Sequence, residues 1–135
     1  MAGLDPSVPS PTEIKLHQKS RVLEIAFSDG KRFSLPFELL RVYSPSAEVR
    51  GHGPGQEVLQ IGKKDIDITH IEPVGSYAVQ LVFSDGHDSG IYSWDYFYEL
   101  GLDRDELWRH YLHRIEEAGA SREPSAPFAE RPKSK

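Results

Sequence analysis

Histidine is the residue type in this chain best suited to bind a metal, because the sequence has six histidines and no cysteine. His52 lies in the glycine-rich stretch 51–55 and His87 follows a Ser-Asp-Gly turn, so we expect both side chains in loops or turns. Neutral imidazoles bind zinc or iron, but a stable site needs further protein ligands in a fixed geometry. The sequence has no close-spaced set of four ligands. We therefore interpret His52 and His87 as structural residues, with a weak zinc or iron site as the alternative.

Two further histidine patterns are explained more simply by solvated surfaces. His70 and Glu72 would lie on one face of a strand, at the local spacing of an iron site with two histidines and one carboxylate. Such a pair arises easily by chance among 21 acidic residues. His110 and His113 are spaced to share a helical face, but no glutamate completes a metalloprotease pattern. We expect these side chains on a strand edge and on an exposed helix face.

The sequence carries no catalytic signature. The stretch 51–55 lacks the Gly-Lys-Ser/Thr ending of a phosphate loop, and no serine lies in a Gly-x-Ser-x-Gly elbow or can be assigned a base and an orienting acid. A chain without cysteine has no disulfide, thiolate metal site or iron–sulfur ligand. We therefore predict no catalytic residue and no resident cofactor, and we favour a protein that is not an enzyme. A small-molecule enzyme with a polar cleft, which local sequence patterns do not reveal, is the alternative.

Composition limits the partners and the location of the protein. Sixteen Lys and Arg against 21 Asp and Glu give a formal net charge of -5, which favours neither nucleic acid nor an anionic membrane as a partner. No apolar run approaches the roughly 18 residues that span a bilayer, and residues 1–6 do not resemble a signal peptide. We expect a cytoplasmic protein of one domain, since 135 residues suffice for a single core.

Alternating polar and apolar residues predict the elements that position these side chains. Segments 12–17, 23–27 and 31–35 read as strands, followed by a helix over 37–43, and segments 65–71, 77–83 and 87–91 repeat this order before a helix over 94–100. The sequence Phe27-Ser-Asp-Gly30 recurs unchanged as Phe83-Ser-Asp-Gly86. Asp103 begins a C-terminal helix that Gly119 ends. The predicted fold is α+β, with a mixed or antiparallel sheet of about six strands from two β-β-β-α units, packed by short helices and the C-terminal helix.

The remaining segments read as tails, a loop and an aromatic surface. We predict disordered tails at 1–11 and 120–135 around a single domain at 12–119, because both ends are rich in proline. Residues 44–57, with three glycines and two prolines, predict an irregular loop long enough to be functional. The run 92–98 carries five aromatic residues, one face of which must pack on the sheet. The other face is a candidate interaction patch.

Several of these segments together resemble a known family. They are Leu-Pro at 35–36, Leu-Leu-Arg at 39–41, Ser-Pro-Ser-Ala-Glu at 44–48, Gly-His-Gly-Pro-Gly-Gln at 51–56 and Phe-Ser-Asp-Gly-His-Asp-Ser-Gly-Ile-Tyr-Ser-Trp at 83–94. Over about residues 12–100 the chain resembles the gamma-butyrobetaine hydroxylase-like N-terminal domain family, in its bacterial stand-alone form. In carnitine-synthesis dioxygenases this domain precedes the iron- and 2-oxoglutarate-dependent catalytic domain. In plants it is also joined to iron–sulfur carrier ATPases.

The resemblance also implies where a metal would bind. The family domain holds a structural zinc through three cysteines and one histidine, and these positions match Ser44, Ser46, Val49 and His87 in this chain. Hydroxyl and isopropyl groups do not replace thiolates on zinc, so we expect the family zinc site to be lost. We expect His87 to hydrogen-bond the 44–57 loop instead, with Ser44 or Ser46 as its partner.

Two functional hypotheses follow. The first is a non-catalytic interaction or scaffold module that contacts a protein partner through the 44–57 loop and the aromatic segment. The residues assigned to this contact surface are Ser44, Ser46, His52, Tyr92, Trp94 and Tyr96. The second is an accessory protein of iron or iron–sulfur metabolism with a weak histidine site, which the family's fusions suggest.

Overall fold

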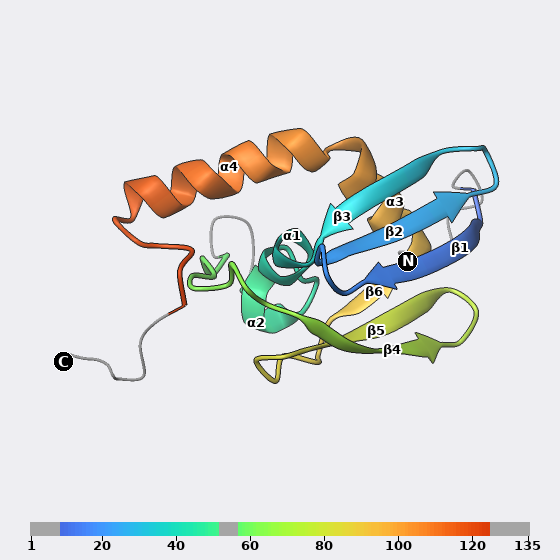
Figure 1. The fold of residues 1–135 in the computed structure, drawn as a ribbon, viewed down its shortest axis with the longest axis horizontal. Coiled ribbons are helices and arrows are strands. Elements are labelled where there is room, and N and C mark those ends of the chain that lie inside the picture. The colour runs from blue at the N-terminus through green and yellow to red at the C-terminus, as the bar shows by residue number, and fades with distance from the viewer. Residues whose placement is uncertain (1–8, 52–56, 125–135) are drawn as a thin grey trace.

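The computed structural model describes residues 9–51 and 57–124, which form six strands and four helices (Figure 1). The order along the chain is β1 (Pro11–His17), β2 (Val22–Phe27), β3 (Arg32–Pro36), α1 (Phe37–Val42), α2 (Ala47–Arg50), β4 (Ile68–Val74), β5 (Ala78–Phe83), β6 (Ile91–Ser93), α3 (Trp94–Leu102) and α4 (Arg104–Glu117). This order confirms the α+β fold with a C-terminal helix. The six strands divide into two antiparallel sheets, β1-β2-β3 and β4-β5-β6.

The two sheets repeat one another in detail, as two β-β-β-α units require. In each sheet the register of the first strand pair shifts near its start, between Pro11 and Glu13 in one and between Ile68 and His70 in the other. A shift of this kind marks a β-bulge or a similar irregularity in the strand pairing. The two units therefore share the place of this irregularity as well as their strand order.

The repeated turns use the same hydrogen bonds. Phe27 N–H donates to the Lys31 carbonyl at 2.8 Å, and Phe83 N–H donates to the His87 carbonyl at 2.9 Å. Gly30 and Gly86 have φ of 91° and 89°, a conformation that glycine adopts without strain. The shared Ser-Asp-Gly sequence thus builds the same turn twice and places His87 directly after the second one.

One hydrophobic core joins both sheets. It contains Leu23, Ile25 and Phe27 from β2 and, at equivalent positions of β5, Val79, Leu81 and Phe83. These side chains lie on one face because residues two apart in a strand point to the same side. α3 contacts both β3 and β6, so it closes the core across the two sheets. Figure 1 shows the sheets next to one another, with α1 and α2 at their left end and α4 running above these two short helices.

Two helices differ from the sequence-based expectation. The stretch 44–57 contains the short helix α2, whose first turn is capped by the Ser46 hydroxyl, accepting from Glu48 N–H at 3.2 Å. The sequence predicts a helix over 94–100, but α3 continues through Gly101 to Leu102. A Cβ on Gly101 would overlap the Phe33 ring, so glycine serves close packing there rather than a helix end.

The segment after α4 folds back onto the domain. Gly62 N–H donates to the Ser121 carbonyl and Lys64 N–H to the Arg122 carbonyl, each at 2.9 Å. Residues 120–124 of the predicted C-terminal tail therefore contact the domain. In the predicted N-terminal tail, the Ser10 carbonyl accepts from Ser28 N–H at 2.8 Å and Pro11 begins β1. Residues 1–8 and 125–135 lie outside the described residues. Within the described ranges, no helix is both long and apolar enough to cross a membrane.

Candidate functional site

A buried polar cluster lies where α1, α2 and the second hairpin meet. His87 Nε2 is 2.8 Å from Ser44 Oγ, and His87 Nδ1 is 3.1 Å from Glu48 Oε1. Ser46 N–H donates to Ser44 Oγ at 3.2 Å, and Ser46 Oγ is 2.7 Å from Ser89 Oγ. His87, Ser44 and Ser46 are all buried. The predicted contact between His87 and Ser44 is present in the structure.

The partners of His87 fix its tautomer. An ionised Glu48 carboxylate only accepts hydrogen bonds, so His87 Nδ1 carries the proton and donates it. In the neutral ring Nε2 then accepts from the Ser44 hydroxyl. Both nitrogens are occupied by protein partners, so the ring connects the end of α1 to α2 and to the second hairpin.

Ser44, His87 and Glu48 have the connectivity of a serine nucleophile, its base and an orienting acid. The sequence indicates no base or acid for any serine. Glu48 and His87 are 39 residues apart and come together only in the fold. Ser44 is 1% exposed, and a Cβ on Gly90 would lie only 2.5 Å from its Oγ. A substrate carbonyl needs to approach Oγ to about 3–3.5 Å. The geometry therefore favours a structural hydrogen-bonded cluster over nucleophilic catalysis.

Charged residues around the cluster set its protonation. Arg41 Nε donates to Asp85 Oδ2 at 2.9 Å and Lys63 Nζ donates to the same oxygen at 2.6 Å. Burial alone would raise the pKa of Asp85, but these cations and the His87 N–H lower it to about 2. Burial and the nearby Arg41 lower the pKa of His87, and this outweighs the opposing effect of Glu48 and Asp85. His87 is therefore neutral around pH 7.

The lowered pKa of His87 predicts that the protein loses stability as the pH falls below about 6.5, the ordinary value for histidine. The unfolded chain binds a proton at His87 in this range while the folded chain does not, so the free energy of unfolding decreases until the pH reaches the folded-state pKa. Urea unfolding at several pH values measures this slope. The variant His87→Gln is expected to show a smaller slope, and an equal slope in both proteins would contradict the assignment.

The zinc site implied by the family resemblance can be tested against these residues. The four matching positions are Ser44, Ser46, Val49 and His87. Hydrogen bonds join Ser44 to Ser46 and to His87. They offer two hydroxyls, an isopropyl group and an imidazole, whereas zinc in such sites takes thiolates and imidazoles. The donor set does not fit zinc. In the described part of the chain no cluster of three or more His, Asp or Glu is arranged to hold a metal ion.

Among the described residues, the other candidate histidines are not brought to this cluster. His70 is an exposed residue of β4 whose Nδ1 is 3.2 Å from Thr69 Oγ1, and Glu72 is likewise exposed on that edge strand. His52 lies outside the described residues, so its assignment to a metal site or contact surface stays a prediction. His110 lines a groove on the neighbouring surface.

This groove, of about 850 Å³, lies next to the cluster, and we call it the α2–α4 groove. It is lined by residues from α1 and its C-terminal end, α2, the segment after it, α3 and α4: Val42, Tyr43, Ser44, Val49, Arg50, Gly51, Glu57, Val58, Tyr96, His110 and Arg114. Arg50 lies over the Tyr96 ring, 5.1 Å from its centroid, and Arg114 Nη2 donates to the Glu57 carbonyl at 3.3 Å. The groove thus combines valine and tyrosine side chains with two guanidinium groups.

The structure divides the predicted contact surface. Tyr96 and Ser44 line the α2–α4 groove, whereas Ser46 is buried in the polar cluster. Tyr92 is fully buried in the core and its hydroxyl donates to the Leu40 carbonyl, so it does not belong to a contact surface. Trp94 packs against the core and its Nε1 donates to the Ser76 carbonyl at 2.8 Å. The aromatic run 92–98 predicts that some rings pack on the core and others reach the surface. Only the fold shows which rings do which.

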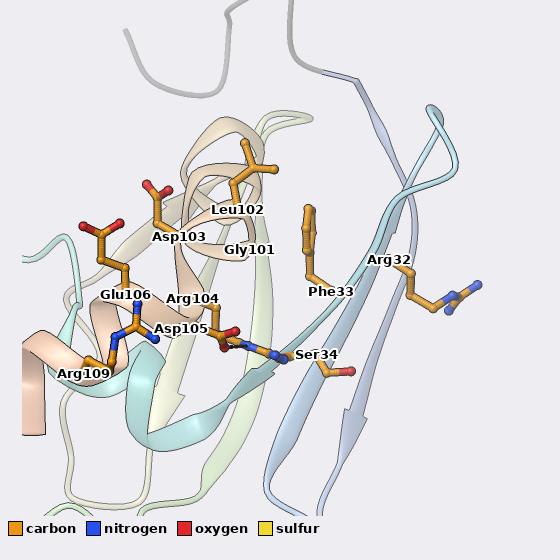
Figure 2. A pocket seen from close by; sticks show the side chains of 10 residues that line it. All are labelled: Arg32, Phe33, Ser34, Gly101, Leu102, Asp103, Arg104, Asp105, Glu106 and Arg109. Atoms are coloured by element: carbon orange, nitrogen blue, oxygen red, sulfur yellow. Dashed lines mark hydrogen bonds and ion pairs between the residues drawn. The ribbon is translucent and has the colours of Figure 1, made fainter.

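A second cleft, of about 440 Å³, lies between β3 and the junction of α3 and α4 (Figure 2). Phe33 stands between β3 and α3, and Arg32 points away from the helices. Arg32 already pairs with two glutamates of its own sheet, and Arg104 pairs with Asp105 and donates to the Ser34 carbonyl. Arg109 also lines this cleft, but Asp103, Asp105 and Glu106 line it too and balance the three arginines. Because its charges balance, this cleft is a weaker candidate for binding a charged ligand than the α2–α4 groove.

Comparison with known proteins connects these features to relatives. Two solution NMR structures each align with a TM-score of 0.76. One is 46% identical and covers 88% of this chain and 94% of the other, while the second is 54% identical and covers 89% of each. A crystal structure of a protein of unknown function from Acidithiobacillus ferrooxidans, of the DUF971 family, is 40% identical with a TM-score of 0.58. It covers 68% of this chain and 92% of that protein. No curated protein matches the chain.

A family model described as gamma-butyrobetaine hydroxylase-like, N-terminal, matches residues 14–98. This range contains both β-β-β-α units up to the middle of α3, including Ser44, Glu48 and His87. The chain belongs to the gamma-butyrobetaine hydroxylase-like N-terminal domain family.

Proposed function

We propose that the protein is a non-catalytic interaction module that binds a protein partner in the α2–α4 groove. The observation that supports this proposal is the groove itself, whose lining combines apolar side chains, Tyr96 and the guanidinium groups of Arg50 and Arg114, with Arg50 over the Tyr96 ring. Contact sites between proteins commonly combine aromatic residues and arginine with an apolar floor. The groove also takes residues from both segments that the sequence assigned to a contact surface, 44–57 and 92–98.

The polar cluster lies directly next to the groove and shares Ser44 with its lining. Ser44 and Val49 line the groove, and Ser44 and Glu48, on either side of Ser46, are bonded to His87. In our proposal these hydrogen bonds hold the α1–α2 segment in place, at the positions where the family resemblance implies a metal in members with cysteines. A groove that is shaped before binding lowers the entropy cost of association.

A pair of matched variants tests the proposal. Val58 lines the groove and Ile61 does not, although both side chains are 50% exposed. Val58→Glu and Ile61→Glu therefore add the same charge to equally exposed apolar positions three residues apart. In quantitative affinity capture from the native cell, we expect at least one protein to be retained by wild type and Ile61→Glu and lost with Val58→Glu. If no captured protein distinguishes the two variants, the groove is not the binding site.

A further inference from the structure

We infer that the partner presents an acidic peptide segment, with one or more carboxylates beside an apolar side chain, to the α2–α4 groove. This inference rests on the proposed function and adds the chemistry of the partner. It follows from the charges along the groove, which differ in sign from the net charge of -5 for the whole chain.

Two guanidinium groups define the basic character of the groove. Arg50 is held over the Tyr96 ring and Arg114 is held by the backbone carbonyl of Glu57. Across residues 9–51 and 57–124, neither makes an ion pair with a carboxylate of this chain. Each guanidinium has five N–H donors, so one stacking contact or one bond to a carbonyl leaves donors for a ligand.

Five other arginines differ from Arg50 and Arg114 in this respect. Each pairs with a carboxylate of this chain; they are Arg21, Arg32, Arg41, Arg104 and Arg122. Among the described groove residues the acidic one is Glu57, which engages Arg114 through its backbone oxygen. Carboxylates are the anions that a planar guanidinium binds best among protein side chains, through two parallel hydrogen bonds.

The apolar part of the groove sets the second requirement. Of the three valines that line it, Val42 and Val49 are buried, whereas Val58 is half exposed. An apolar side chain of the partner would cover Val58 while a neighbouring carboxylate reaches Arg50 or Arg114. A segment that alternates acidic and apolar residues satisfies both requirements, whereas a basic or purely polar segment satisfies neither.

The test compares two labelled peptide pools by fluorescence anisotropy. One pool has Asp or Glu at alternate positions with Leu or Phe between them, and the other carries Asn or Gln in place of each acid. We expect wild type to bind the acidic pool about tenfold or more tightly than the amide pool, because a hydrogen bond to a charged group is stronger than one to an amide. Equal binding of both pools would overturn the inference.

Arginine variants locate the contact. Arg50→Gln and Arg114→Gln are each expected to reduce the preference for acidic peptide, whereas Arg109→Gln, on the same helix as Arg114 but in the other cleft, leaves it unchanged. An equal loss with all three would mean nonspecific charge attraction and would contradict the inference. If Val58→Glu abolishes capture of a partner while the two groove arginine variants have no effect, the proposed function stands and the acidic chemistry is wrong. If a segment of this chain occupies the groove, so that neither peptide pool binds there, this result would also contradict the inference.

Discussion

Replacing Arg122 with alanine is expected to lower the free energy of unfolding by about 2–3 kcal/mol. Arg122 donates two hydrogen bonds to the Glu38 carboxylate, at 2.8 and 2.7 Å, and Tyr111 donates a third at 2.7 Å. Glu38 is buried, so removing Arg122 leaves a carboxylate with one remaining donor away from water. The expected loss is below that of a fully buried pair because the Arg122 side chain is 32% exposed.

Chemical denaturation of two further variants separates this effect from the general loss of a surface charge. Lys64→Ala removes an ion pair to Glu123 in the same C-terminal segment, but both partners are well exposed, so we expect a change of about 0.5 kcal/mol or less. Adding Glu38→Gln to Arg122→Ala removes the stranded charge and is expected to recover part of the stability. Similar losses in Arg122→Ala and Lys64→Ala would show that the Glu38 contact contributes little.

The Arg122 contact also matters for the groove. It joins the segment after α4 to α1, and Arg122 lies over the Trp108 ring of α4, 5.1 Å from its centroid. Tyr111 of α4 reaches the same carboxylate from the helix itself. Because α4 supplies Arg114 and His110 to the groove, a weakened attachment of α4 would widen or reshape the binding site.

The triple variant Ser44→Cys, Ser46→Cys and Val49→Cys is expected to bind one zinc ion with a dissociation constant of about 10⁻⁸ M or below. These substitutions place thiolates at the three positions that match the family cysteines, and His87 Nε2 already faces Ser44. Zinc binding by the folded state alone would raise the midpoint of thermal unfolding. Competition with a chromogenic chelator measures the affinity, and the absorption of a cobalt complex reports thiolate ligation.

Adding His87→Ala to the triple variant provides the control. The fourth ligand is then absent, so zinc should bind much more weakly and the cobalt spectrum should change. If the triple variant binds no zinc, or binds it equally well without His87, the buried cluster does not correspond to the family metal position.

The parts of this structure that were predictable from sequence depend on short-range chemistry. The turns after Phe27 and Phe83 follow from Ser-Asp-Gly, because glycine at positive φ and an aspartate acceptor act within a few residues. The alternation in β2 and β5 likewise fixes which side chains enter the core. Even the contact between Ser44 and His87 was predictable, but only because the family resemblance brings those two positions together.

Other features depend on contacts between distant parts of the chain. Glu48 reaches His87, and Arg122 reaches Glu38 from 84 residues away, so neither partner is indicated by local spacing. Proline near the C-terminus predicted a tail, yet a buried carboxylate on α1 draws residues 120–124 onto the domain. The position of Tyr92 in the core was missed because five aromatic residues in one run give no signal for the buried face.

Whether hydrogen bonds rather than a metal hold His87 is decided most directly by its ring ¹⁵N resonances, recorded in wild-type protein between about pH 5 and pH 8. We expect a neutral ring with the proton on Nδ1, a titration midpoint below the ordinary value of 6.5, and no change when one equivalent of zinc is added. A ring that carries its proton on Nε2, or that shifts on addition of zinc, would contradict the hydrogen-bonded cluster.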